Sequence, residues 1–455
     1  MATRILRQIP GWPIVVELDA HCPMDVRLPT QSVRLELLEI THDYEPDYWI
    51  PTNTPHATLR SAAVKLFING HPVTLRCRPY EPPREFFGLR LYVESTRLWS
   101  DPPQLFPLEN MCGDVRLSFV AAGESWGPSD LRFPLSDFRW RSSTYQNTWN
   151  SLVPFNHLYY HRGEDFGAIP DRLQIIAPLD GTVTRSPLPT GDGKSNGLVI
   201  TTPHGISYRI AHMNIESIAT DLIAGASVTA GQPLAETGMT WDGRKSQTHD
   251  SHLHFQIDLD GEHPTALSPF PFLVEAYFRD YPDALLPIAG GYAFGTVGQP
   301  VLLDASRSLA RPGRTIPSFR WNLHNGQTFS GSAGTIIYDR PGYYSEEILL
   351  TADGIIDRDY LQVRIYDPTS KSPQDIASGW LHTFPCRPKV GEPVLIWNRL
   401  INTSNVTLEP GDGSSKPITS EATHTYTRPG LYWLTLRGEG PNAEPVTASV
   451  RVVVE

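Results

Sequence analysis

Cysteine is scarce in this chain of 455 residues, and its four cysteines lack the spacing of a metal-binding motif. None of Cys22, Cys77, Cys112 and Cys386 belongs to a Cys-x-x-Cys pair, which argues against a zinc site built from thiolates. Four cysteines are also too few for a scaffold stapled by disulfides. Whether two of the three in the N-terminal third form a disulfide depends on the redox compartment, so that pairing stays open.

Long apolar runs and basic clusters are absent as well. No stretch approaches the roughly 20 apolar residues that a membrane-spanning helix needs. The formal net charge is −11 and no Lys/Arg run interrupts it, which argues against nucleic acid or anionic membrane as the main partner. The first ten residues contain no apolar core of a signal peptide. We expect no nucleic-acid partner and no membrane span, and the oligomeric state stays open.

Proline and glycine, in contrast, are plentiful, with 42 and 35 residues. Proline presets φ and glycine permits positive φ, so both suit a chain that turns often. A length of 455 residues gives about three or four domains at one domain per 100–200 residues. The composition therefore predicts a mainly β, multidomain protein.

The N-terminal part is predicted to be β-rich and sandwich-like. The apolar run Ala63–Ile68 ends in Asn69-Gly70, a dipeptide typical of a two-residue hairpin turn. The runs Leu89–Val93 and Val115–Val120 are likewise bounded by turn residues. No metal or nucleophile constellation is found here, so we expect a domain that flanks the next one, with substrate or carbohydrate recognition as the alternative.

The C-terminal part repeats itself. The segment Tyr338–Tyr344 is echoed by Tyr426–Tyr432, 88 residues later. Each copy ends in a run with period-two alternation, Leu361–Ile365 and Ala448–Val454, which is typical of strands with one buried face. A repeat of this length predicts two tandem β-sandwiches.

These two copies resemble PKD domains, a family of extracellular immunoglobulin-like modules. In the first copy, Val301–Ser308 is similar to the family's Asp-Ala-Ser-x-Ser segment, and Phe319–Trp321 to its core strand. The second copy keeps Gly411–Gly413 and His424–Tyr432 but lacks the Asp-Ala-Ser segment and the core tryptophan, so it is PKD-like and divergent. The resemblance implies adhesion, spacing or contact with glycans and proteins, not catalysis.

Histidines gather in three segments of the middle part, Tyr159–Gly167, Tyr208–Asn214 and His249–Ile257. In the third segment apolar residues alternate with polar ones, which predicts a strand with His252 and His254 on the same face, roughly 6–7 Å apart. At that spacing one imidazole can bind a metal while the other contacts a water bound to it, as metal-assisted hydrolysis requires.

A metal site is also indicated by His161 and Asp165, which bracket Gly163. With His254 they supply three ligands of the kind zinc prefers and leave a fourth position open, as in catalytic rather than structural zinc sites. Each motif alone is more often a solvent-facing or hydrogen-bonded group than a ligand. Their combination and order, with His212 between them, is far more specific.

The middle part resembles the lysostaphin/LytM-type zinc metallopeptidases, which cleave bacterial peptidoglycan peptides. Their order of motifs is His-x-x-x-Asp, a single His, then His-x-His, and Ile176–Val183 and Ile223–Leu234 resemble the connecting turns. The resemblance implies one Zn²⁺ per chain and a division of roles among five residues. The implied zinc ligands are His161, Asp165 and His254, and the implied catalytic histidines are His212 and His252.

The chain departs from this family in three places. Ile210 stands where many members have a tyrosine, and the insertion Trp241–Thr248 is longer and more polar than usual. No certain counterpart exists for the tyrosine that assists the oxyanion in some members. Candidates for that role or for substrate contact are Tyr159, Tyr160, Tyr208 and Trp241. Glu164 lies between residues that face the metal, so we expect its side chain to point away.

We therefore predict four domains. They are an N-terminal β-rich domain at 1–140, a LytM-like antiparallel β peptidase domain at 141–285, a PKD-like domain at 288–368 and a divergent PKD-like domain at 378–455. A helix within Pro271–Phe278 is expected to close the second domain, before a linker marked by prolines.

The leading hypothesis for function is a zinc endopeptidase acting on peptidoglycan through a zinc-bound water and two catalytic histidines. One alternative is a zinc-dependent lyase of an acidic polysaccharide using the same metal site. Another is a non-catalytic wall-binding protein. The expected partner is a peptidoglycan peptide or another cell-surface polymer. The expected location is secreted, periplasmic or cell-surface, although no signal peptide is visible in this sequence.

Overall fold

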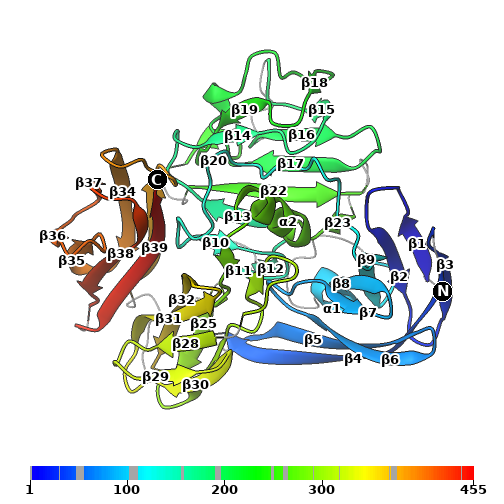
Figure 1. The fold of residues 1–455 in the computed structure, drawn as a ribbon, viewed down its shortest axis with the longest axis horizontal. Coiled ribbons are helices and arrows are strands. Elements are labelled where there is room, and N and C mark those ends of the chain that lie inside the picture. Colours follow the sequence, from blue (N-terminus) through cyan, green and yellow to red (C-terminus); the bar gives the residue numbers. More distant parts are fainter. Residues whose placement is uncertain are drawn as a thin grey trace.

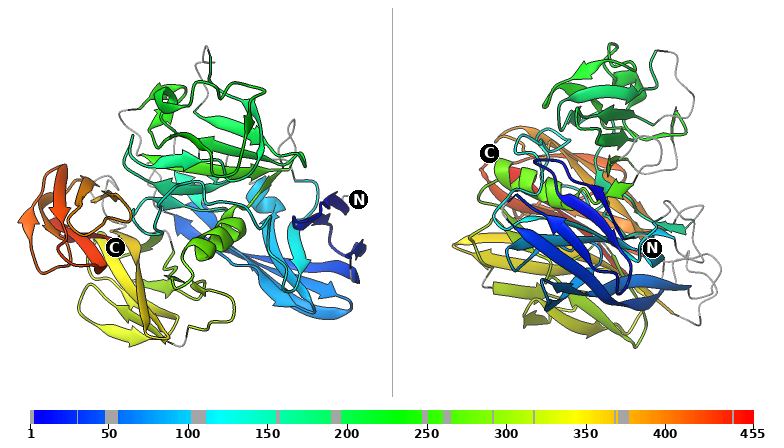
Figure 2. Two further views of the ribbon diagram at one scale, coloured as in Figure 1. Left: turned by 45° about the horizontal axis from the view of Figure 1, so that its top comes forward. Right: turned by 90° about the vertical axis from the view of Figure 1, so that its right-hand side faces the viewer.

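The structure is a computed structural model that confirms the mainly β, multidomain architecture, with 53% of residues in strands and 5% in helices. Four β-rich parts surround a common centre (Figure 1). The part from the middle of the chain, drawn in green, projects from the others in the side view (Figure 2, right). The structure describes residues 3–29, 31–47, 56–101, 111–154, 158–189, 196–246, 251–259, 265–290, 292–316, 318–367, 369, 377–441 and 443–455.

The N-terminal part is a sandwich of two antiparallel sheets, called here the N-terminal sandwich. Its five-stranded sheet has the order β1 (Arg4–Arg7), β2 (Ile14–Leu18), β9 (Val115–Ala121), β8 (Leu89–Thr96) and β7 (Arg84–Phe86). Its four-stranded sheet has the order β3 (Met24–Arg27), β4 (Ser32–Asp47), β5 (His56–Ile68) and β6 (His71–Cys77). Apolar side chains of both sheets form one buried cluster between them.

The predicted hairpin turn in this sandwich is confirmed. β5 ends at Ile68 and β6 begins at His71, and Asn69 and Gly70 between them both have positive φ, at 51° and 82°. Two positive φ values match the right-handed twist of the flanking strands, which is why Asn-Gly is favoured there. All four cysteines are free thiols, so none of the three in this part of the chain is bridged.

The middle of the chain forms an eight-stranded antiparallel sheet, called here the central sheet. Its order is β10 (Gln146–Asn147), β13 (Glu164–Gly167), β22 (His252–Asp258), β17 (Ser207–Ala211), β16 (Leu198–Thr201), β15 (Gly181–Arg185) and β18 (Ser227–Val228), with β23 (Ala266–Leu267) beside β22. Short hairpins border it: β11 (Leu152–Pro154) with β12 (Leu158–Tyr160), β14 (Gln174–Ile176) with β19 (Pro233–Glu236), and β20 (Thr240–Trp241) with β21 (Arg244–Lys245).

In the described part of the chain, three helical segments accompany these sheets: α1 (Arg97–Ser100), the 3₁₀ turn η1 (Ile215–Ser217) and α2 (Phe270–Asp280). α2 confirms the helix predicted within Pro271–Phe278. A proline in its first turn suits a helix start, where the missing N–H has no partner to lose. Among the described residues no helix is long and apolar enough to cross a membrane.

An aromatic cluster ties the central sheet to residues before it. Phe166 on β13 lies 5.1 Å from Phe133, 5.2 Å from Phe138 and 5.6 Å from Trp140, measured between ring centroids. Residues 126–140, assigned to the N-terminal domain in the sequence prediction, thus pack into the core of the central sheet. The domain boundaries themselves stay predictions.

The C-terminal part consists of two sandwiches that share a nine-stranded sheet. That sheet has the order β25 (Tyr292–Thr296), β32 (Ile355–Tyr366), β31 (Gly342–Ala352), β39 (Pro445–Val454), β38 (Gly430–Glu439), β35 (Ser404–Glu409) and β36 (Lys416–Pro417). In addition β28 (Ser318–Asn322) pairs with β31, and β29 (Thr328–Ser330) pairs with β28. The remaining strands form β24 (Leu285–Leu286) with β27 (Leu309–Ala310), β26 (Pro300–Asp304) with β30 (Ala333–Ile337), and the three-stranded sheet β33 (Ser378–Phe384), β34 (Pro393–Ile401) and β37 (Glu421–Thr425).

The internal repeat corresponds to the same turn in both sandwiches. The Tyr344 hydroxyl donates to the carbonyl oxygen of Arg340, and the Tyr432 hydroxyl donates to that of Arg428, both over 3.0 Å. These pairs are 88 residues apart, as the repeat requires. The first C-terminal sandwich is formed by the strands from β24 to β32, and the second by the strands from β33 to β39.

Removal of the Phe166 ring tests whether the aromatic cluster holds strand β13. Phe166 is 1% exposed, so Phe166→Ala is expected to lower the free energy of unfolding by about 3–5 kcal/mol, through lost burial and a residual cavity. Urea denaturation measures this. The control, Phe87→Ala, removes a ring that is 50% exposed and should change stability by about 0.5 kcal/mol or less. Equal effects of the two variants would contradict the assignment.

Candidate metal centre

Strand register brings two of the predicted ligands together. In the pairing of β13 with β22, Asp165 lies directly opposite His254. On the other edge of β22, Ala211, the last residue of β17, also lies opposite His254. The next residue in the chain, His212, is therefore close to His254 as well. The alternation predicted for the His-x-His strand is confirmed, because Leu253 and Phe255 are buried in the core of the central sheet.

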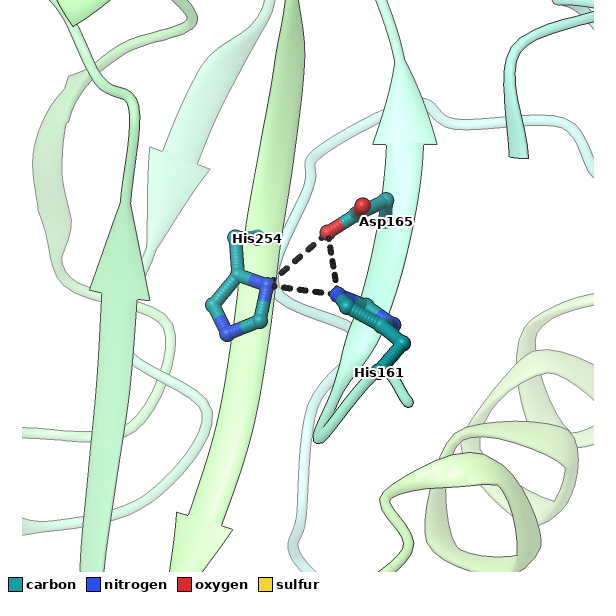
Figure 3. Close-up of side chains that lie close together, drawn as sticks. All are labelled: His161, Asp165 and His254. Carbon is teal, nitrogen blue, oxygen red and sulfur yellow. Dashed lines mark hydrogen bonds and ion pairs between the residues drawn. The ribbon is translucent and has the colours of Figure 1, made fainter. Parts of the chain in front are cut away.

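The side chains of His161, Asp165 and His254 converge (Figure 3). Nε2 of His161 lies 3.1 Å from Nδ1 of His254 and 3.2 Å from Oδ1 of Asp165. Nδ1 of His254 lies 2.9 Å from the same Oδ1. The side chains of His161 and Asp165 are 3% and 4% exposed but that of His254 is 15% exposed, so the cluster is most open on the His254 side.

The tautomers of His161 and His254 follow from the hydrogen-bond partners of the ring nitrogens that face away from the cluster. Nδ1 of His161 lies 3.3 Å from the carbonyl oxygen of Thr148, an acceptor, so it carries the proton and leaves a lone pair on Nε2. Nε2 of His254 lies 3.3 Å from Oε1 of Gln256, whose amide group donates to Asp258. Nε2 therefore carries the proton of His254, and its Nδ1 presents a lone pair to the cluster.

Three lone pairs at this spacing fit a small divalent cation. Zinc bonds of about 2.0–2.1 Å in tetrahedral geometry separate the ligand atoms by about 3.3 Å, and the three observed separations are 2.9, 3.1 and 3.2 Å. Two imidazoles and one carboxylate with a fourth position open form the donor set of a catalytic zinc site. The residues present therefore fit the metal that the sequence predicts.

The carboxyl groups of Asp165 and Glu164 are neighbours in the chain, but their pKa values shift in opposite directions. Burial alone would raise the pKa of Asp165, but without a metal the neighbouring His161, His252 and His254 hold that pKa well below its usual range, so the carboxylate stays ionised. Burial raises the pKa of Glu164, whose carboxylate accepts hydrogen bonds from the Thr148 hydroxyl at 2.5 Å and from a backbone N–H at 3.2 Å. Glu164 thus points away from the cluster, as predicted.

Gly163 is required by the close approach of His254. A Cβ atom at this position would lie 2.6 Å from Cε1 of the His254 ring and 2.7 Å from the carbonyl oxygen of Phe255. Its φ is +156°, which non-glycine residues rarely adopt. The glycine between the two motif residues therefore makes room for the third.

The remaining two histidines lie beside the cluster and against each other. The ring centroids of His212 and His252 are 4.6 Å apart, and Nε2 of His252 is 3.8 Å from Oδ2 of Asp165. Nδ1 of His212 lies 2.8 Å from the carbonyl oxygen of Thr240, which places its proton there. Burial is the main cause that lowers the pKa of His212 well below its usual value, so its ring is neutral.

This order of residues has a counterpart among known families. Residues 159–265 match the family model described as peptidase family M23. This segment is an M23 peptidase domain. The match covers roughly a quarter of the chain and includes all five residues of the site. Peptidases of this family are generally metal-dependent, so the match supports a metallopeptidase. No curated protein matches the chain.

Some solved structures resemble parts of the chain. The fibronectin(III)-like modules of Clostridium thermocellum CbhA are 10% identical, with 38% of this chain and 94% of that chain covered and a TM-score of 0.15. SGBP-B of the Bacteroides ovatus mixed-linkage glucan utilization locus is 13% identical, with 57% and 62% covered and a TM-score of 0.13. The N-terminal four Ig domains of Dscam1 are 11% identical, with 87% and 94% covered and a TM-score of 0.14. At such TM-scores these likenesses carry no argument.

The M23 domain opens into a cavity of about 830 Å³ that is lined by all four parts of the structure. All five histidine and aspartate residues of the site line it, and so do Tyr159 and Trp241 among the further candidates. Of the insertion that contributes Trp241, residues 247 and 248 lie outside the described residues. Trp241 stacks on His212, with ring centroids 4.3 Å apart and an interplanar angle of 27°.

Two of the candidate tyrosines were wrongly placed at the cleft. The Tyr160 hydroxyl accepts a hydrogen bond from the backbone N–H of Leu59 at 2.7 Å, and its ring packs into the core of the N-terminal sandwich. The Tyr208 hydroxyl donates to the carbonyl oxygen of Leu179 at 2.7 Å, within the core of the central sheet. Both are satisfied elsewhere, because the alternation of their strands directs them to the opposite face.

Sequence reasoning missed Tyr145, whose ring stacks on that of His252 at 4.7 Å with an interplanar angle of 23°. It stands well before the first motif of the M23 domain, in a stretch with no recognisable pattern. The signal that could have found it is weak: an aromatic residue next to a short strand that pairs with the strand of Asp165.

Gly163→Ala tests the packing around the ligands. Because the added methyl group collides with the His254 ring, we expect the affinity for Zn²⁺ to fall about 10–100-fold, measured by titration of the metal-free protein. Gly231→Ala is the matched control, since Gly231 also has positive φ, at 83°, but its Cβ would meet nothing within 4 Å. Equal losses in both variants would attribute the effect to backbone strain and not to the ligand contact.

Proposed function

We propose that this protein is a zinc endopeptidase that hydrolyses peptide bonds of bacterial cell-wall peptidoglycan. The proposed ligands of its one Zn²⁺ are His161, Asp165 and His254. The observation that carries the proposal is the convergence of two imidazole nitrogens and one carboxylate oxygen, 2.9–3.2 Å from one another, inside an M23 domain. Two imidazoles and a carboxylate favour zinc over magnesium or calcium, which prefer oxygen ligands alone.

The proposed chemistry divides between the metal and two histidines. Zinc, when bound, lowers the pKa of a water molecule toward about 7 and polarises the scissile carbonyl. His212 holds its proton at Nδ1 against the carbonyl oxygen of Thr240, which leaves Nε2 to accept a proton from the attacking water. His252 lies between His212 and Asp165, where it can hydrogen-bond the developing oxyanion.

The proposed substrate and location follow from the surroundings of the M23 domain. A cavity of about 830 Å³ can hold a peptide segment, and four β-rich parts line it. The C-terminal sandwiches, which we propose to be PKD-like, would contact the cell-wall polymer beside the cleaved peptide. A peptidoglycan peptide, or another cell-surface polymer, requires a secreted, periplasmic or cell-surface protein, and that is the proposed location.

The lining of the cavity also suits a second candidate, a zinc-dependent lyase of an acidic polysaccharide. Five arginines and three aspartates line the cavity, so its lining is positive on balance although the whole chain carries a net charge of −11. Such a lining attracts carboxylates, which both uronic-acid glycans and peptidoglycan peptides carry. Lyases create an ultraviolet-absorbing double bond, so absorbance during incubation with uronic-acid glycans identifies this activity. New amino groups released from peptidoglycan identify the peptidase instead.

Two substitutions separate metal binding from chemistry. His254→Ala is expected to abolish both zinc binding and hydrolysis, because it removes one of three ligands. His252→Ala should keep one zinc per chain and lose about 10²–10⁴-fold in kcat, because it removes a group that acts only in the reaction. Metal analysis and mass spectrometry of peptides released from purified peptidoglycan provide the measurements.

The control for these variants is His204→Ala, which removes an exposed histidine of the same domain and should change neither readout. Hydrolysis by metal-free His254→Ala protein would refute the zinc mechanism. A wild-type protein that binds no zinc under non-chelating conditions would favour the non-catalytic wall-binding alternative.

A further inference from the structure

A row of aromatic rings in contact, two pairs of them stacked and two tilted, leads from the catalytic histidines out of the M23 domain. Trp241 stacks on His212 at 4.3 Å, and His212 lies 4.6 Å from His252. His252 stacks on Tyr145 at 4.7 Å, and Tyr145 lies 5.2 Å from Trp380 of the second C-terminal sandwich. Three of these five rings are outside the predicted set of ligands and catalytic histidines, and Trp380 comes from a different sandwich.

The outer end of this row is fixed by both C-terminal sandwiches. Trp380 lies on β33, and its indole Nε1–H donates to the hydroxyl of Tyr292 on β25 over 3.0 Å. Tyr145, Trp380 and Tyr292 all line the cavity that contains the cluster of His161, Asp165 and His254. The wall of the cavity next to His252 is therefore built by strands from outside the M23 domain.

The segment before Tyr145 is joined to β33 by backbone hydrogen bonds. The N–H of Thr144 donates to the carbonyl oxygen of Leu381 at 3.0 Å, and the N–H of Thr383 donates to that of Ser142 at 3.2 Å. The N–H of Leu381 donates to the Thr144 hydroxyl at 2.9 Å. The chain leading to Tyr145 thus extends the small sheet of the second C-terminal sandwich.

The other side of the same segment packs against the strand of Asp165. The N–H of Gly167 donates to the carbonyl oxygen of Tyr145 at 3.0 Å. A Cβ atom on Gly167 would lie 2.1 Å from the Ser143 hydroxyl oxygen and 2.7 Å from Cβ of Tyr145. Because no space separates the segment from β13, a displacement of β33 is transmitted to the neighbourhood of Asp165 and His252.

We propose that Trp380 and Tyr145 are positioning residues for His252, so that the second C-terminal sandwich is part of the catalytic site. Rotation of an imidazole about its χ2 angle is soft, so neighbouring groups set the ring's orientation. A small misplacement of a catalytic group can cost about 10²-fold in rate. The inference rests on the proposed function for its catalytic meaning, but the orientation of the ring can be tested without it.

The first test is made on the full chain with Trp380→Leu and Trp380→Phe. We expect Trp380→Leu to lower kcat at least about tenfold with KM and zinc content unchanged, and Trp380→Phe to recover most of that loss by restoring a ring. The control is Trp397→Leu on β34, which removes an indole of the same small sheet that contacts His382 and Arg399. A raised KM with unchanged kcat, or an equal loss in Trp397→Leu, would overturn the proposal.

A second pair of variants covers the case in which Trp380→Leu does not fold. Tyr145→Leu removes the ring next to His252, whereas Tyr145→Phe keeps the ring and removes only the hydroxyl. If stacking is the role, Tyr145→Phe recovers most of the kcat that Tyr145→Leu loses. Equal losses in the two variants would assign the function to the hydroxyl and would refute positioning by the ring.

Nuclear magnetic resonance of histidines labelled at Cε1 provides a readout independent of hydrolysis. The His252 signal, assigned as the one missing from His252→Ala, should shift or broaden in zinc-loaded Trp380→Leu and Tyr145→Leu and not in Trp397→Leu. An unmoved signal with unchanged kcat refutes the inference while leaving the peptidase intact. A wild type that binds zinc but cleaves no peptidoglycan refutes the proposed function, and the signal still decides whether the ring is positioned.

Discussion

The arrangement of the site depends on one constraint, the register of the short strand β13 against β22. Asp165 faces the cluster because it lies directly opposite His254, and its neighbour Phe166 faces the core for the same reason. A shift of the pairing by one residue would turn the carboxylate into an aromatic core and the phenyl ring toward the metal position. The burial of Phe166 thus specifies the orientation of Asp165, the proposed ligand on the opposite face of the strand.

Glycines on either side of this strand allow the neighbours to come close enough. Gly163 makes room for the His254 ring before the strand, and Gly167 makes room for the Tyr145 segment at its end. With a side chain at either position, one of the two elements that flank β13 would have to move. The strand therefore combines a large apolar side chain in its centre with two glycines, and this combination fixes the position of Asp165, the proposed ligand.

The sequence allows prediction of those features that depend on local pattern. Alternation along His252–Ile257 is visible in the sequence, as are the Asn69-Gly70 turn and the repeat of the C-terminal tyrosines, because each is determined within a few residues. Which face of a strand meets the cavity depends on the sheet that packs against it, and this is why Tyr160 and Tyr208 were assigned to the wrong side. Tyr145 and Trp380 are more than 230 residues apart in sequence, so no local pattern relates them.

The segment recognised as an M23 domain is consequently smaller than the structure that forms its site. The partners of Phe166 precede residue 159, and the wall beside His252 comes from β33. Buried ion pairs reinforce these connections: Arg141 lies 2.9 Å from Asp359, and Arg451 lies 2.9 Å from Asp357. Separating the parts would leave such charges without partners, which is costly, so the flanking sandwiches act as structural members of the site. The family motif points to the proposed ligands, and the surrounding sandwiches contact the groups beside them.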